Sequence, residues 1–207
     1  MKLPTKLTKA TASFGIGLAA FAVLALPVAS VSAQTTSDTS TSVINGIIGS
    51  SITITSAGPV DINVTPTDTA VMSSANDTVT VDTNHADGYT LSLEMNGATT
   101  TLANGSDTIA AHSAVVGSAS DLAANTWGFR VDGAGDFGAG TTTAESNVET
   151  SAHTWAGVPA KGSPVTIKTT SSPAAGDETA VWYAMKADAS KPSGTYTNTV
   201  LYTAVTN

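Results

Sequence analysis

The sequence predicts an all-β protein built as a single antiparallel β-sandwich. Three observations lead to this expectation. Apolar and polar residues alternate with a period of two over many short stretches, and turn-forming dipeptides separate those stretches. Beyond residue 33 no stretch has an apolar stripe of helical period, so helices that cross over between strands are not expected.

The N-terminus has the three parts of a secretory signal. Three lysines within the first nine residues give a basic start, an apolar run follows over residues 14–26, and Val31-Ser32-Ala33 offers small residues to a signal peptidase. Cleavage is therefore expected before Gln34, which makes residues 1–33 a cleaved signal peptide. The apolar run is shorter than the ~20 residues that cross a bilayer. We expect no membrane span after cleavage; an uncleaved membrane anchor is the alternative.

Two segments follow the signal peptide. Residues 34–42 are nearly all Thr, Ser and Gln, which predicts a polar, mobile leader. Residues 43–207 carry the alternating pattern and are expected to form the sandwich domain. Threonine is frequent in this part of the chain, and it is a β-branched residue that suits a pleated sheet.

Alternation places the expected strands along the domain. In chain order they lie at Ser51–Thr55, Val60–Val64, Asp77–Thr83, Tyr89–Met95, Trp127–Val131, Val165–Ile167, Thr179–Ala187 and Thr195–Val205. Turn signals separate several of them, and Asn96-Gly97 is the strongest hairpin signal. Residues 133–151 are weakly patterned and are expected to form a long surface loop or a hairpin excursion. About eight short antiparallel strands without helices are typical of an Ig-like sandwich.

Two expected strands supply large apolar faces for a core. Alternate positions of Trp127–Val131 and of Tyr89–Met95 carry the big side chains, so each strand turns one apolar face inward. Core packing is the expected role of all three tryptophans. Trp155 lies between expected strands, and for it an exposed contact role is the alternative.

Charge and composition exclude several classes of function. The chain has 8 basic and 16 acidic residues, and removal of the signal peptide takes three bases and no acid, which leaves a net charge of −11. A surface so acidic excludes binding to nucleic acid through a basic face. The chain has no cysteine, so it has neither disulfides nor thiolate metal sites.

Two loops contain residues of the kinds found in ligand-binding sites, but neither has the surrounding sequence that such a site requires. Residues 133–138 match G-x-G-x-x-G, but the sequence that follows is a poor helix, so we expect a flexible loop and no dinucleotide. Asp132 and Asp136 share that loop, and Asp82, Asn84 and Asp87 share another. Neither has the spacing of a known calcium loop, and such residues also stabilise turns, so no metal site is assigned.

No motif of known catalytic mechanism occurs in the sequence, so no catalytic or cofactor-binding residue is assigned and the chain is not expected to be an enzyme. The histidines, which lie in expected loops and are expected to be solvated, are His85, His112 and His153. The glutamates, which have no informative neighbours, are Glu94, Glu145, Glu149 and Glu178. A secreted hydrolase stays as a minor alternative, because the separation of two carboxylates depends on the fold.

Two stretches resemble the strand pairs of WxL-type bacterial surface domains: Asp87–Leu93 and Ser193–Ala204. The resemblance implies an exported, Thr-rich β-sandwich that associates non-covalently with the cell wall. Tyr89 and Tyr202 stand where such a domain carries tryptophan, so the resemblance implies architecture and location rather than a ligand.

Two further stretches, Asn125–Arg130 and Thr154–Pro159, resemble uncharacterised exported proteins of Saccharibacteria and related ultrasmall bacteria. The expected function is that of a secreted structural or adhesive protein at the cell surface, with cell-wall polymer or other surface proteins as partners. The first alternative is a fibre or pilus-like subunit that self-assembles by strand exchange. It is suggested by the apolar segment Val43–Ile48 after the polar leader, although that segment is more simply the first strand of its own sheet.

Overall fold

The computed structural model describes residues 38–134, 137–138 and 140–207. The expected signal peptide and its cleavage site before Gln34 lie outside these residues. The chain divides into two units, residues 1–46 and residues 47–207. The described residues before Ile52 form no strand, and their side chains are exposed. No helix in the described part of the chain is long and apolar enough to cross a membrane.

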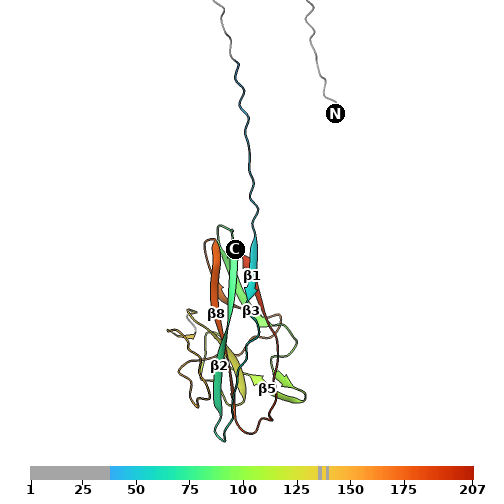
Figure 1. Ribbon diagram of the computed structural model, residues 1–207, viewed down its shortest axis with the longest axis vertical. Coiled ribbons are helices and arrows are strands. Elements are labelled where there is room, and N and C mark those ends of the chain that lie inside the picture. The colour runs from blue at the N-terminus through green and yellow to red at the C-terminus, as the bar shows by residue number, and fades with distance from the viewer. Residues whose placement is uncertain (1–37, 135–136, 139) are drawn as a thin grey trace, which may run out of the picture. The chain divides into compact units, whose positions relative to one another are not determined.

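The unit from residue 47 onward contains two β-sheets (Figure 1). Its strands are β1 (Ile52–Ser56), β2 (Val71–Thr83), β3 (Tyr89–Met95), β4 (Leu102–Asn104), β5 (Asp107–Ala111), β6 (Thr126–Val131), β7 (Val165–Thr169), β8 (Ala174–Ala187) and β9 (Val200–Thr206). Six strands form one sheet in the order β1-β2-β8-β6-β5-β4, and three form the other in the order β7-β3-β9. The expectation of an all-β, two-sheet protein is confirmed.

Most expected strands are present, with two corrections near the N-terminal end. The segment Val43–Ile48 is not a strand of the protein's own sheet, since the first strand is β1. Val60–Val64 is not a strand either, although its exposure alternates as the sequence pattern does. β2 and β8 are longer than expected and pair along most of their length, which makes them the centre of the larger sheet.

The core lies between the two sheets, and the two expected apolar faces meet in it. On β3 the side chains of Tyr89, Leu91, Leu93 and Met95 are fully buried. On β6 the inward side chains are Trp127, Phe129 and Val131, and they belong to the same buried cluster. The apolar side chains of β2 and β8, Val79, Val81, Val181 and Tyr183, complete the cluster from the larger sheet.

A second, smaller core lies on the opposite face of the larger sheet. Trp155 is fully buried there against Met72, Leu122 and Ala184. Residues 72 and 184 belong to β2 and β8 but have the opposite parity to the inward positions, so their side chains point away from the main core. The alternative that Trp155 is an exposed contact residue is therefore wrong.

The region expected to be a surface loop helps to cover this outer face. The backbones of Val148 and Met72 pair in both directions, and so do those of Trp155 and Ser120. The side chain of Glu145 accepts hydrogen bonds from Ser151 Oγ and Ala152 N, at 2.6 and 2.8 Å, which ties the loop to itself. The long loop is thus a packed layer.

One hairpin forms where it was not expected. β4 and β5 join through Gly105 and Ser106, with Asn104 paired to Asp107 and Gly105 at a φ of 62°. Gly105 is the first of the two turn residues, the position at which a type II′ hairpin turn requires a positive φ. Asn96-Gly97, the expected hairpin, instead begins a longer loop to β4, and the partners of β3 are β7 and β9. β5 also pairs with β6 in parallel, which departs from the expected all-antiparallel arrangement.

Candidate binding cleft

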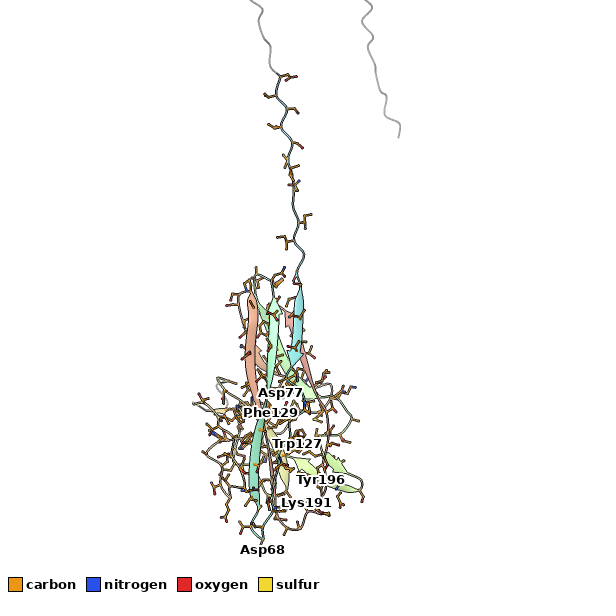
Figure 2. The ribbon with its side chains drawn as sticks, viewed as in Figure 1. Asp68, Asp77, Trp127, Phe129, Lys191 and Tyr196 are labelled. Carbon is orange, nitrogen blue, oxygen red and sulfur yellow. The ribbon has the colours of Figure 1, made fainter. Side chains whose placement is uncertain are left out.

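A cleft of about 800 Å³ opens between two extended segments of the unit that begins at residue 47. One rim is formed by residues 58–63, which follow β1, and the other by residues 194–200, which lead into β9. The floor comes from β2, β6 and β8 and includes Asp77, Trp127 and Tyr183. In Figure 2, Asp77, Trp127 and Tyr196 lie one below another along the long axis.

The local sequence explains why the first rim leaves the larger sheet. The last backbone bond after β1 runs from Ala57 N to Thr78 O, at 3.1 Å. Gly58 then takes a φ of 128°, a conformation open to glycine, and Pro59 has no N–H to donate to a ladder. Beyond this break, Val60 and Ile62 turn their side chains toward the main core, while Asp61 between them is exposed.

The floor of the cleft is aromatic. The rings of Trp127 and Tyr183 stack with their centroids 6.4 Å apart and an interplanar angle of 28°. The Trp127 Nε1–H donates to Thr100 O at 2.8 Å, which fixes the indole. The hydroxyls of Tyr183 and Tyr202 lie 2.7 Å apart and share a hydrogen bond.

One buried carboxylate lies beside these rings. Asp77 is only 4% exposed and accepts hydrogen bonds from Ser56 Oγ at 2.7 Å and from Ala57 N at 3.0 Å. Burial raises the pKa of the Tyr183 phenol above its ordinary value. Burial also raises the pKa of Tyr202, with further contributions from Tyr183 and Asp77. Both phenols are therefore neutral at physiological pH and able to donate or accept hydrogen bonds.

The second rim is held from behind. Thr197 pairs with Ala103 of β4 through two backbone hydrogen bonds of 3.0 Å. The Asn198 amide donates to Thr99 O and Thr101 O, at 3.0 and 2.7 Å. Tyr196 donates to Pro192 O at 2.8 Å. These contacts fix the rim on its β4 side and leave the other side facing the cleft.

The chemistry of the cleft suits binding of a largely apolar ligand that also has hydrogen-bonding groups. Besides the aromatic rings, the lining contains Val60, Ile62, Leu102, Met185 and Val200, and its polar groups are mainly hydroxyls, amides and backbone. Among the residues that the structure describes, no three histidine or acidic side chains come close enough to hold a metal ion.

Three of the side chains in the loops considered for calcium form hydrogen bonds within the fold, and Asp87 is exposed. Asp82 accepts a hydrogen bond from Gly176 N at 2.6 Å. The Asn84 side chain accepts from Ser51 N at 2.8 Å and donates to Gly49 O at 2.9 Å. Asp132 accepts from Thr142 N at 2.9 Å, and Asp136 lies outside the described residues.

The three histidines lie in loops, as expected, but they do not share one environment. His112 is buried, which contradicts the expectation of a solvated side chain, and its Nε2 lies 3.0 Å from Ser120 Oγ. Desolvation by burial lowers the pKa of His112. His85 and His153 are half-exposed.

A polar cluster outside the cleft joins β3, β7 and β8. The Lys168 ammonium donates to Asp177 Oδ1 at 2.6 Å, and the Tyr89 hydroxyl donates to Asp177 Oδ2 at 2.7 Å. Desolvation favours a raised pKa for Asp177, but the hydrogen bonds from Lys168 and Tyr89 hold that pKa below its ordinary value. Burial, followed by the contact with Asp177, raises the pKa of Tyr89.

No protein-family model, no curated protein and no solved structure matches the chain. The sequence pattern does not reveal the cleft, because it predicts ordinary strands for both rims, at Val60–Val64 and Thr195–Val205. One available signal was the Gly58-Pro59 pair, which interrupts the alternating pattern just before Val60.

Proposed function

We propose that this chain is an exported structural protein of the cell surface, with an Ig-like sandwich, whose subunits associate through residues 43–48. We call this segment the apolar arm. The observation that carries the proposal is its exposure: Val43, Ile44, Ile47 and Ile48 are 82–94% exposed and belong to neither sheet. Contiguous exposed apolar residues mark an interaction surface, because leaving them in water is unfavourable.

The sequence around the arm supports this role. The arm contains no charged residue and follows a polar leader, so it is free of the repulsion that the acidic chain would otherwise impose. Extended apolar segments of this kind add a strand to a partner's sheet, where main-chain hydrogen bonds supply affinity and alternate side chains supply specificity. The secretory pattern of residues 1–33 supports export. We propose no catalytic role.

Export is tested by mass spectrometry of the extracellular fraction of cells that express the full chain. We expect a mature N-terminus at Gln34. An N-terminus at Met1 or Lys2 would instead indicate an anchored protein and would contradict release.

Assembly is tested by comparing the mature chain with a variant that lacks residues 43–48. In detergent without heating, the parent is expected to give a ladder of polymers that collapses to a monomer on boiling. The deletion variant is expected to run as a monomer and to keep the urea midpoint of the parent, because the arm belongs to neither sheet. Polymers that survive the deletion would contradict the proposed function.

A further inference from the structure

Each rim of the cleft has backbone N–H and C=O groups that form no hydrogen bond to another of the described strands. Within the described part of the chain, residues 58–64 make no backbone–backbone hydrogen bond. β9 is the last strand of its sheet, so no described strand forms a hydrogen-bonded ladder with its outer edge, although β1 lies close to it. Open edges of this kind are templates for an added strand.

The pairing of Thr197 shows which groups of the second rim point into the cleft. Both backbone groups of Thr197 bond to Ala103, on the β4 side. In an extended strand the backbone groups of successive residues point to opposite sides. The N–H and C=O of Tyr196 and Asn198 therefore point the other way, and both residues line the cleft.

The size and chemistry of the cleft match those of the arm. The first rim is an extended segment of six residues, and the arm also has six, roughly 20 Å when extended. Val60, Ile62 and Met185 offer apolar surface to Ile and Val side chains. The one carboxylate of the floor, Asp77, already has two donors, so it requires no cation from a ligand.

The arm of the same molecule is tethered at the start of β1, whereas the cleft begins at the end of β1. Gly49, which directly follows the arm, is held by the bond from Asn84 to its carbonyl, and Ser51 is held by the same side chain. β1 then runs from this point to Ser56 and covers roughly 15 Å before the cleft begins. An arm folded back along β1 would use most of its length to reach the near rim. Only the arm of another molecule is free to lie in the cleft along its whole length.

We propose that the apolar arm of one copy inserts as a strand into the cleft of a second copy, between residues 58–63 and residues 194–200. The inference rests on the proposed function and names its acceptor. Donor and acceptor are different surfaces of one chain, so the contact is head-to-tail and propagates into an open filament unless it closes into a ring.

The test uses two variants of the mature chain, each defective in one surface. Ile44→Asp with Ile48→Asp disables the arm, and Ile62→Asp disables the cleft. Each variant alone is expected to lose every species above the monomer in sedimentation. A mixture of the two is expected to give a dimer and nothing larger, because the only compatible contact joins the arm of the Ile62→Asp variant to the intact cleft of the other. Val115→Asp changes an apolar residue that is 63% exposed outside both surfaces, and it should polymerise as the parent does.

The outcomes separate the inference from the proposed function. If Ile62→Asp still polymerises while the arm variant is a monomer, the arm is a donor but this cleft is not its acceptor, and the inference is overturned. If the arm variant also polymerises, the proposed function itself fails.

A cross-linking measurement decides the matter if Ile62→Asp does not fold. The chain has no cysteine, so disulfides can form only between introduced residues: Asn63→Cys in one copy and a single cysteine at one of the arm positions 43–48 in another. We expect heterodimers at alternate arm positions, as strand geometry requires. Asp121→Cys, at an exposed residue that is not part of the cleft lining, is the matched control. Cross-linking to Asp121→Cys as efficient as to Asn63→Cys would overturn the inference.

Discussion

The backbones of Phe129 and Ala156 pair in both directions, with N···O distances of 2.7 and 3.0 Å. This pair attaches a segment far along the chain to the edge of β6, beyond the end of β5. It also fixes the neighbouring Trp155 on the outer face of the larger sheet. The segment around Trp155 and Ala156, which lacks strand alternation, thereby becomes part of the folded core.

We therefore expect Trp155→Ala to destabilise the protein about as much as Trp127→Ala. Both side chains are buried, and removing a buried tryptophan costs ~3–5 kcal/mol, a large part of the ~5–15 kcal/mol that stabilises a domain. Urea melts of the two purified variants measure this. Val115→Ala, at an exposed position, should change the free energy of unfolding by less than ~0.5 kcal/mol. A Trp155→Ala variant that melts like the parent would contradict the second core.

Gly128 makes the same attachment possible. A Cβ at this position would lie 2.5 Å from the carbonyl oxygen of Ala156, which is the acceptor of the bond from Phe129 N. Gly128→Ala is therefore expected to cost at least ~1–3 kcal/mol, the usual range for overpacking. Thermal melts test this with Gly97→Ala as the control, since a Cβ at Gly97 would lie 3.8 Å from its nearest neighbour, Asn198 Oδ1. Equal melting temperatures for the two variants would contradict the close approach.

Periodicity predicted the strands well where one face is buried and the backbone has a partner. Tyr89–Met95 is the clearest example, since every second side chain is buried and both edges pair. Val60–Val64 has the same alternation but no backbone partner among the described residues, because alternation reports only which side faces the core. The cleft exists because Val60–Val64 faces the core without pairing to a strand. The alternating pattern is the same in both cases, so it could not reveal the cleft.

The local sequence pattern could not predict the burial of Trp155 and His112 for another reason. Their burial depends on contacts with residues distant in sequence, among them Met72 and Ala184 for Trp155. The polarity of neighbouring residues carries no record of such contacts. The β4–β5 turn differs, because its two residues, Gly105 and Ser106, are themselves a local hairpin signal in the sequence.

The ion pair between Lys168 and Asp177 is expected to make stability depend on pH in the acid range. The folded pKa of Asp177 lies below its unfolded value, so the stabilisation is complete above pH ~4 and is lost as pH falls through the folded pKa. Both side chains are about 30% exposed, so the contribution stays below ~1 kcal/mol. Urea midpoints of the parent and of Asp177→Asn should differ at pH 6 and converge toward pH 2. A difference that grows on acidification would contradict the ion pair.

His112 is expected to give a second pH dependence, at higher pH. Burial lowers its folded pKa below the unfolded value of ~6.5, so the unfolded chain binds a proton first as the solution is acidified. The stability from the neutral, buried imidazole is therefore complete above pH ~6.5 and declines as pH falls toward the folded pKa. His112→Gln removes the titration, so its stability should change less between pH 7.5 and pH 5 than that of the parent.

His153→Gln is the matched control for this measurement, because His153 is a half-exposed loop histidine. It should keep the pH dependence of the parent over the same interval, which lies above the range where most carboxylates titrate. The Nε2 of His112 lies 3.0 Å from Ser120 Oγ, so Ser120→Ala provides an independent check. That variant is expected to lower stability at pH 7.5 and to leave the histidine-dependent slope in place. If His112→Gln and His153→Gln lose stability with pH as steeply as the parent, the buried imidazole does not control stability in this range.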